Sequence, residues 1–191
     1  PVLYARLLAI KAAGRALPPP DDETVEALRR LIMDQPQDPA LATAMGAIRL
    51  QRGGWEVVEA MTYARRSMEL GATNLAAYVT AGEIARQNGS YPESVRFLRE
   101  GLTRYPDNHV LLNNLLYTLL AVVPTPTNEI ADAAQRLTPL GGEDPAYRDT
   151  LGAAQLALGR ATEAEAILRP LLTDCENGTP LWFRASTHLA E

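Results

Sequence analysis

The sequence predicts an all-α chain of repeated antiparallel helix hairpins, and three observations support this. Ala and Leu dominate the apolar residues, while aromatic residues make up only 6% of the 191 residues, a composition that favours closely packed helices. No stretch alternates apolar and polar residues for long, so a β-sheet has little support. Similar segments recur, and their eighth residues lie 36, 34, 36 and 34 residues apart, at Gly46, Gly82, Leu116, Gly152 and Ser186.

The expected elements follow in chain order from local start and stop signals. The first is a helix over residues 2–16, which ends at the Pro18-Pro19-Pro20 break, and the second is a helix over residues 22–34. Hairpins then follow over residues 39–71, 75–105, 109–139 and 145–173, and a final helix starts near residue 180. The sequence therefore predicts about eleven helices.

Caps and turns support these boundaries. Asp38-Pro39 and Asp144-Pro145 each place a hydrogen-bond acceptor before a proline whose missing N–H costs nothing in the first turn of a helix. Gly53, Gly89 and Gly159 fall where the first helix of a hairpin must end, as a left-handed C-terminal cap requires. The small residues at most of the recurring eighth positions let two antiparallel helices cross closely.

Two segments carry a family resemblance. They read DTLGAAQLALGRATEAEAIL at residues 149–168 and AYVTAGEIARQNGSYPESVRFL at residues 77–98. These two segments resemble the repeat unit of the tetratricopeptide (TPR) family. That unit has about 34 residues and carries the pattern W-x2-L-G-x2-Y, then A-x3-F, then Pro. The chain departs from that pattern at Leu116, which replaces the small residue, and in two units that are two residues longer, near Gly53-Gly54-Trp55 and near residues 123–127.

The resemblance covers essentially the whole chain and implies an α-solenoid with a right-handed superhelical twist, formed by a bacterial TPR protein. We expect one solenoid domain over residues 1–191, with approximate repeats 1–38, 39–74, 75–108, 109–144 and 145–178 and a partial repeat 179–191. Because the chain starts at Pro1 and ends inside an expected helix, we expect it to be a fragment of a longer protein.

Composition argues against several classes of function. The formal net charge is −5 and no Lys/Arg cluster is longer than a pair, so a nucleic-acid partner is not expected. Lys11 is the only lysine beside many arginines, which hints at a GC-rich bacterial gene. The longest apolar run, residues 110–123, is too short to span a bilayer, so we expect no direct membrane insertion within this segment.

No catalytic or metal site is predicted. Cys175 is the only cysteine, and His109 and His188 lie far from each other in the sequence, so no zinc pattern arises. The acidic pairs lie at helix starts, where negative charge favours the helix dipole. Nothing nominates a nucleophile with its base. We therefore expect no enzymatic activity and no cofactor.

What remains is a binding surface. The resemblance implies that the first helix of each hairpin lines a concave wall, on which family ligands contact the second, fifth, sixth, ninth, twelfth and thirteenth positions. In this chain these positions include Thr43, Ala47, Val79, Thr80, Glu83, Arg86, Gln87, Asn113, Asn114, Tyr117, Leu120, Asp149, Thr150, Phe183, Arg184 and Thr187.

Within this wall the candidate partner-binding residues centre on Asn113, Asn114 and Tyr117. Side-chain amides can bond to the backbone of an extended peptide, and a phenol ring offers flat area at low entropic cost. The other candidates lie on neighbouring repeats and are Glu83, Arg86, Asp149, Phe183 and Arg184. An equally weighted alternative is a solvated wall on which the amides only bond to neighbouring helices.

The leading hypothesis is a non-catalytic scaffold that binds a peptide or helix of a partner protein in a concave groove, in a bacterial assembly, secretion or envelope process. One alternative is a self-assembling structural solenoid, since self-association is possible through the final helix or the convex face. Another is the substrate-recognition arm of a larger membrane-anchored or enzymatic protein. The sequence does not choose between cytoplasm and periplasm, and does not name the partner.

Overall fold

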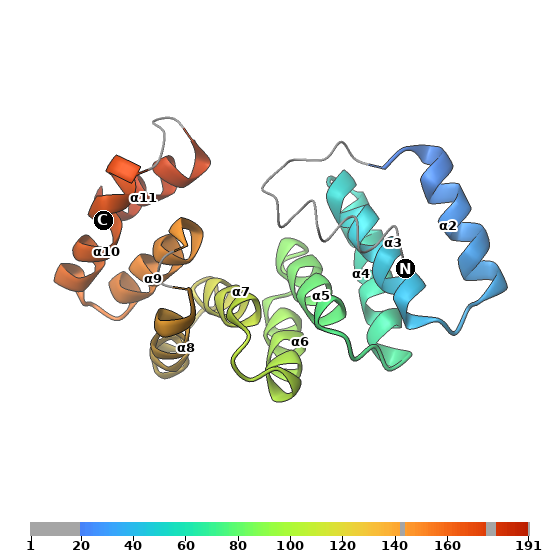
Figure 1. Ribbon diagram of the computed structural model, residues 1–191, viewed down its shortest axis with the longest axis horizontal. Helices are drawn as coiled ribbons and strands as arrows, with labels where there is room; N and C mark the ends of the chain where they lie inside the picture. The colour runs from blue at the N-terminus through green and yellow to red at the C-terminus, as the bar shows by residue number, and fades with distance from the viewer. Residues whose placement is uncertain (1–19, 142–143, 175–178, 191) are drawn as a thin grey trace. The chain divides into compact units, whose positions relative to one another are not determined.

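The structure is a computed structural model that describes residues 20–141, 144–174 and 179–190. Its helices are α2 (Asp22–Asp34), α3 (Pro39–Arg52), α4 (Glu56–Glu69), α5 (Leu75–Gln87), α6 (Tyr91–Arg104), α7 (His109–Leu119), α8 (Thr127–Gly141), α9 (Pro145–Ala157), α10 (Ala161–Asp174) and α11 (Pro180–Ala190) (Figure 1). The described parts contain no strand. The all-α prediction is therefore confirmed, while the helix expected over residues 2–16 lies outside the described residues.

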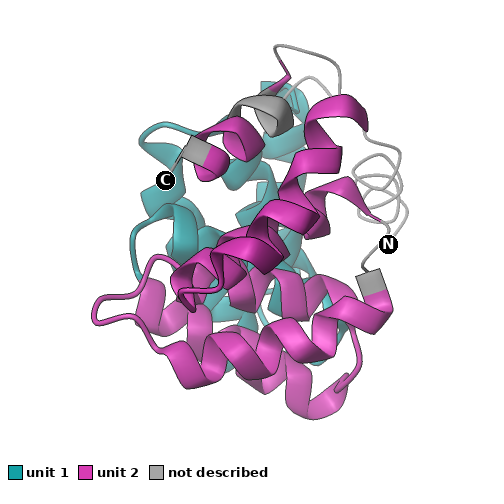
Figure 2. Cartoon of the chain, turned by 90° about the vertical axis from the view of Figure 1, so that its left-hand side faces the viewer, with its two compact units in different colours: residues 1–90 teal, residues 91–191 magenta. Residues whose placement is uncertain are grey.

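The chain divides into two compact units, residues 1–90 and 91–191 (Figure 2). Within the first unit, α3 packs against α2, α4 and α5, and α4 also packs against α5. Within the second unit, α7 packs against α6, α8 and α9, and α9 packs against α8, α10 and α11. The expected hairpins α3–α4, α7–α8 and α9–α10 therefore form, and within each unit the first helices of successive hairpins touch one another.

The first helices begin at side-chain caps. Asp38 and Asp144 accept hydrogen bonds from the backbone N–H of Ala40 and Ala146, each at 2.8 Å. Two asparagines that the sequence analysis did not single out, Asn74 and Asn108, cap α5 and α7 in the same way. Each cap satisfies a backbone donor that the first turn of a helix leaves unpaired.

Glycine ends the first helices as predicted. Gly53, Gly89 and Gly159 have φ values of 70°, 75° and 73°, a left-handed conformation that side chains with a Cβ disfavour. Two further glycines, Gly54 and Gly71, also have positive φ, at 58° and 80°. Gly53 and Gly54 form the lengthened turn between α3 and α4, so the extra residues are accommodated where the backbone is least restricted.

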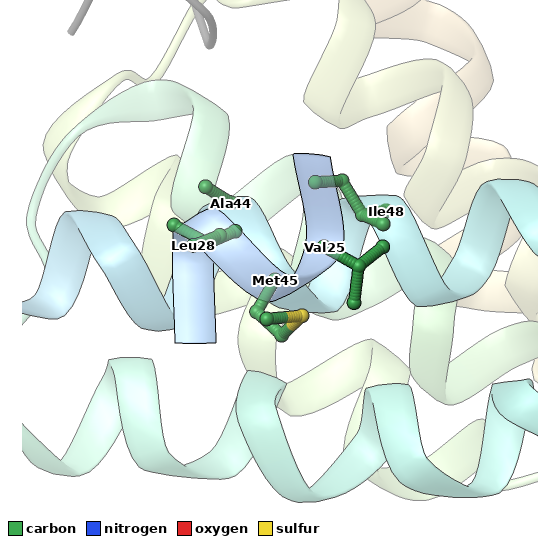
Figure 3. Close-up of a cluster of buried hydrophobic side chains, with 5 residues drawn as sticks. All are labelled: Val25, Leu28, Ala44, Met45 and Ile48. Atoms are coloured by element: carbon green, nitrogen blue, oxygen red, sulfur yellow. The ribbon is translucent and has the colours of Figure 1, made fainter. Parts of the chain in front are cut away.

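An apolar cluster joins α2 to α3. Val25 and Leu28 of α2 lie against Ala44, Met45 and Ile48 of α3, and all five are buried (Figure 3). The equivalent cluster near the C-terminus joins α10 to α11 and is formed by Ala164, Leu168, Leu171 and Ala185. Burial of such side chains contributes about 25 cal/mol per Å² and is the main force that holds neighbouring helices together.

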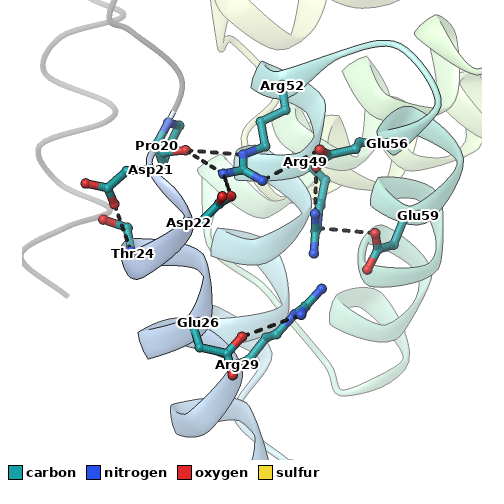
Figure 4. A network of polar contacts seen from close by, with 10 residues as sticks. All are labelled: Pro20, Asp21, Asp22, Thr24, Glu26, Arg29, Arg49, Arg52, Glu56 and Glu59. Carbon is teal, nitrogen blue, oxygen red and sulfur yellow. Dashed lines mark hydrogen bonds and ion pairs between the residues drawn. The ribbon is translucent and has the colours of Figure 1, made fainter.

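An ion-pair network around the buried Arg49 also ties α3 to α4 (Figure 4). The Arg49 side chain is 3% exposed, and its guanidinium lies 2.7 Å from Glu56 and 3.3 Å from Glu59. Arg52 contacts Glu56 at 3.7 Å and Asp22 at 2.6 Å. Since an unpaired buried charge is costly, the two glutamates are what allow Arg49 to occupy the interior of this hairpin.

Candidate partner-binding surface

The second unit places three first helices in a row, because α9 packs against both α7 and α11. These helices carry six of the eight candidate residues. Asn113, Asn114 and Tyr117 lie on α7, Asp149 lies on α9, and Phe183 and Arg184 lie on α11. The remaining two, Glu83 and Arg86, lie on α5 in the first unit.

Helix α7 presents an uncharged polar surface. Asn113 and Asn114 are half-buried, and Tyr117 is 36% exposed. The Asn113 Oδ1 atom is buried and has no hydrogen-bond partner among the described residues. An unsatisfied buried acceptor costs about 1–3 kcal/mol, so this atom lowers the stability of the folded chain.

Asp149 and Arg184 form an ion pair between neighbouring helices. The Arg184 Nε atom lies 3.1 Å from Asp149 Oδ2, and the His188 Nε2 atom lies 4.0 Å from Asp149 Oδ1. Asp149 is only 1% exposed, whereas the Arg184 side chain is 45% exposed. The buried carboxylate therefore fixes the orientation of the guanidinium. Arg184 is the member of the pair that is exposed to solvent or to a partner.

The environment of Asp149 changes its acidity. Burial raises the pKa of its carboxyl group above the ordinary value of 3.8, and the nearby charges of Arg184 and His188 oppose that rise. Burial dominates because it disfavours the charged form of an acid. The Oδ1 atom of this carboxylate has no hydrogen-bond partner within the described parts of the chain.

A second contact joins α7 to α9. His109 Nδ1 lies 3.0 Å from the Tyr147 hydroxyl, and the two rings are tilted by 56° with centroids 5.5 Å apart. Burial and the nearby charge of Asp144 raise the pKa of the Tyr147 phenol. The His109–Tyr147 pair therefore extends the polar surface of the row to the N-terminal ends of α7 and α9.

On α5, Glu83 and Arg86 pair with each other. The guanidinium of Arg86 donates to both carboxylate oxygens of Glu83, at 3.0 and 2.7 Å, and Gln87 donates to the same carboxylate at 2.7 Å. Side chains three and four residues apart meet on one face of a helix, which explains the cluster. The structure thus joins these two candidates as a local pair.

Not every position implied by the resemblance lies on a surface. Thr43 and Thr150 are buried, and their hydroxyls donate to the backbone oxygens of Pro39 and Ala146 at 2.9 and 3.1 Å. Both side chains therefore serve helix packing, which corrects their placement on the wall. Phe183 belongs to α11, but its side chain lies outside the described residues.

Sequence reasoning missed that His188 lies near Asp149 together with Arg184. The signal was present, because His188 follows Arg184 by four residues and so lies on the same helix face. Tyr147 was also missed, since its proximity to His109 depends on how α9 packs against α7. No sequence spacing encodes that contact.

The described residues include neither a metal-binding cluster nor a membrane-spanning helix. In that part of the chain, no three or more His, Cys, Asp or Glu residues gather closely enough to hold a metal ion. Nor does any described helix have the length and apolar character needed to cross a bilayer.

The chain is similar to known proteins in its structure and not detectably in its sequence. No family model and no curated protein sequence matches the chain. Among solved structures, a thermophilic TPR protein of Thermus thermophilus is 20% identical with a TM-score of 0.66, and the match covers 97% of each chain. YrrB, described as a TPR protein with an unusual peptide-binding site, is 18% identical with a TM-score of 0.65, covering 87% of this chain and 84% of YrrB.

A third similar structure is MamA from Desulfovibrio magneticus, which is 16% identical with a TM-score of 0.69 and is matched over 90% of this chain and 92% of its own. At these identities the likeness concerns the fold. The recurring hairpins, the glycine caps and these three structures agree with one another. The chain therefore folds as an α-solenoid of the tetratricopeptide repeat type.

Proposed function

We propose that this chain is a non-catalytic interaction scaffold that binds a segment of a partner protein along the row formed by α7, α9 and α11. The observation that carries the proposal is that α7 presents two half-buried side-chain amides, Asn113 and Asn114, beside the exposed ring of Tyr117. Side-chain amides can both donate to and accept from the backbone of an extended peptide.

The surrounding residues support a peptide rather than a charged small molecule. Between His109 and Asn128 the chain has no Asp, Glu, Lys or Arg, so α7 offers amides and a phenol instead of ions. Arg184, oriented by Asp149, supplies a charged group two helices away. The peptide-binding site named for YrrB, which has a similar fold, supports such a ligand for this chain.

The biological setting we propose is a bacterial assembly, secretion or envelope process. Its support is the nearly exclusive use of Arg over Lys and the bacterial origin of the similar structures from Thermus thermophilus and Desulfovibrio magneticus. Glu83 and Arg86 of α5 lie in the first unit, and their role in binding stays a separate prediction for that unit.

The test uses random linear peptides displayed as a library and selected on the purified chain. For a selected peptide, the Asn114→Ala/Tyr117→Ala double variant and the Asn113→Ala variant should each raise the dissociation constant by about fivefold or more, the effect of losing one or two binding hot spots. Helical circular dichroism should stay unchanged, because these side chains are partly exposed.

The matched control is Asn128→Ala, which removes an exposed asparagine from α8, outside the row. It should leave the affinity unchanged. If every selected peptide bound the row variants as tightly as the unmodified chain, the row would not be the binding surface and the proposal would fail.

A further inference from the structure

Part of the surface of α2 is apolar and lies outside its contact with α3. Ala27 is exposed and Leu31 is 45% exposed, and neither belongs to the buried cluster that joins α2 to α3. They are four residues apart and so lie on one side of the helix, and Glu23 and Asp34 continue that line at its two ends. These four residues form the α2 row, which has an apolar middle and an acid at each end.

The two acids of the α2 row differ from other acids of the same helix, which have basic partners. Asp22 lies 2.6 Å from Arg52, and Glu26 lies 3.5 Å from Arg29 (Figure 4). By contrast, the acids at the two ends of the row form no ion pair with any other described residue. A segment that carries both apolar and basic side chains would therefore match the row in character and in charge.

The sequence that precedes α2 has this complementary pattern. Leu3, Leu7 and Ile10 recur at spacings of four and three residues, which would place them on one side of a helix. All the charged side chains among residues 1–20 are basic, and they are Arg6, Lys11 and Arg15. The segment over residues 2–16 is therefore apolar along one line and positively charged, whereas the α2 row is apolar in its middle and negatively charged at its ends.

The dimensions of the segment and of α2 agree. A helix over residues 2–16 would be about 22 Å long, and α2 is about 20 Å long. Pro18, Pro19 and Pro20 cannot continue a helix, and three residues in polyproline form span about 9 Å, close to the distance of about 8–10 Å between the axes of packed helices. Arg52 donates to the backbone oxygen of Pro20 at 2.9 and 3.2 Å, which fixes the point from which the segment would return.

We propose that residues 2–16 form a helix that folds back antiparallel to α2 and covers the α2 row. Arg15 then lies near Glu23, beside the turn, and Arg6 lies near Asp34, at the far end. The nine residues between the two arginines correspond to about 13 Å of helix and the eleven between the two acids to about 16 Å, a difference that long arginine side chains can bridge. The contact lies in the first unit and does not depend on the partner-binding proposal.

Hydrogen exchange of the whole chain, followed by mass spectrometry, measures the protection of the backbone amides of residues 2–16. Leu31→Asp should accelerate their exchange by at least about tenfold, because it puts a charge against the apolar line of the segment. Glu23→Arg should accelerate it by about twofold, the effect of losing one exposed ion pair. Adding Arg15→Glu to Glu23→Arg should restore the protection, because the pair is then reversed and not lost.

Met33→Asp is the matched control, since Met33 is an apolar residue of the same helix that is 81% exposed and lies two residues from Leu31, on another side of α2. It should leave the exchange of residues 2–16 unchanged. Rapid exchange of these residues in the unmodified chain, or equal effects of Leu31→Asp and Met33→Asp, would overturn the proposal. Protection that appears only at high protein concentration would also overturn it, because a second copy would then be the occupant.

Discussion

At the scale of single residues, the buried carboxyl group of Asp149 affects the stability of the folded chain. Its carboxylate is enclosed between α9 and α11, where Arg184 supplies the nearest opposite charge and His188 a more distant one. A charge in such a place is stabilised only partly by its partners, because burial removes the water that would otherwise solvate it. The residue therefore contributes to stability in a way that depends on pH.

The direction of that dependence follows from the raised pKa of Asp149. Below its ordinary value of 3.8 the carboxyl group is protonated in both states. Between that value and the raised folded-state pKa, the folded chain keeps a proton that the unfolded chain has released. Its contribution to the free energy of unfolding is thus complete at low pH and is lost as pH rises through this interval.

We expect the Asp149→Asn variant to lack this loss, because an amide does not ionise. The difference in free energy of unfolding, variant minus unmodified chain, should increase as pH rises from 3.8 and then level off above the raised pKa. Urea titrations of both chains at a series of pH values measure it. The comparison should be repeated with His188→Gln in both chains, which removes the imidazole that lies near this carboxylate. A difference that stays flat with pH would contradict the prediction.

At the scale of elements, helix pairs approach through glycine to different degrees. A Cβ atom built on Gly152 of α9 would lie 2.4 Å from Leu168 Cγ, in the buried side of α10. On Gly46 of α3 it would lie 3.1 Å from the tip of Ile84. The same residue type at the same repeat position is therefore required by packing where α9 meets α10 and only favoured where α3 meets α5.

Alanine substitution should distinguish the two. Gly152→Ala should lower the free energy of unfolding by about 1–2 kcal/mol, since overpacking of about 1–3 kcal/mol exceeds the helix propensity that alanine adds. Gly46→Ala should change it by less than about 1 kcal/mol, because a side-chain tip can move and the propensity gain offsets the remaining cost. Urea unfolding compares them. Equal losses of stability would mean that the contact between α9 and α10 relaxes as easily as the contact between α3 and α5.

At the scale of the whole molecule, the contacts described join helices that are near neighbours in sequence, such as α3 with α4 and α9 with α10. A chain organised this way behaves as a one-dimensional array, in which stability is a sum of local terms. Damage to one hairpin should therefore remain within its neighbourhood. Arg49, which is buried in the first unit, and Gly152, in the second, offer a test.

Hydrogen exchange followed by mass spectrometry should show that locality. Arg49→Ala leaves Glu56 and Glu59 without their buried partner and should accelerate exchange mainly in α2, α3 and α4. Gly152→Ala should accelerate exchange mainly in α9 and α10. If either substitution raised exchange uniformly across both units, the chain would unfold as one cooperative body instead.

The repeat period, the helix boundaries and the caps could be predicted from sequence alone because they depend on interactions within a few residues. Asp38 and Asp144 accept hydrogen bonds from backbone N–H groups two residues away. The cap at Gly53 depends only on the positive φ angle of that glycine. The candidate residues on α7, Asn113, Asn114 and Tyr117, followed from the family resemblance and not from local interactions, and their role in binding stays a prediction.

What the tertiary structure decided are the contacts between residues about one repeat apart or between neighbouring helices. These include the burial of Asp149 behind Arg184 and the pairing of Arg49 with two glutamates. The physical reason is that helix periodicity gives the face on which a side chain lies, whereas its partner and its exposure depend on how closely two helices pack, and that is set by the shapes of all the side chains between them.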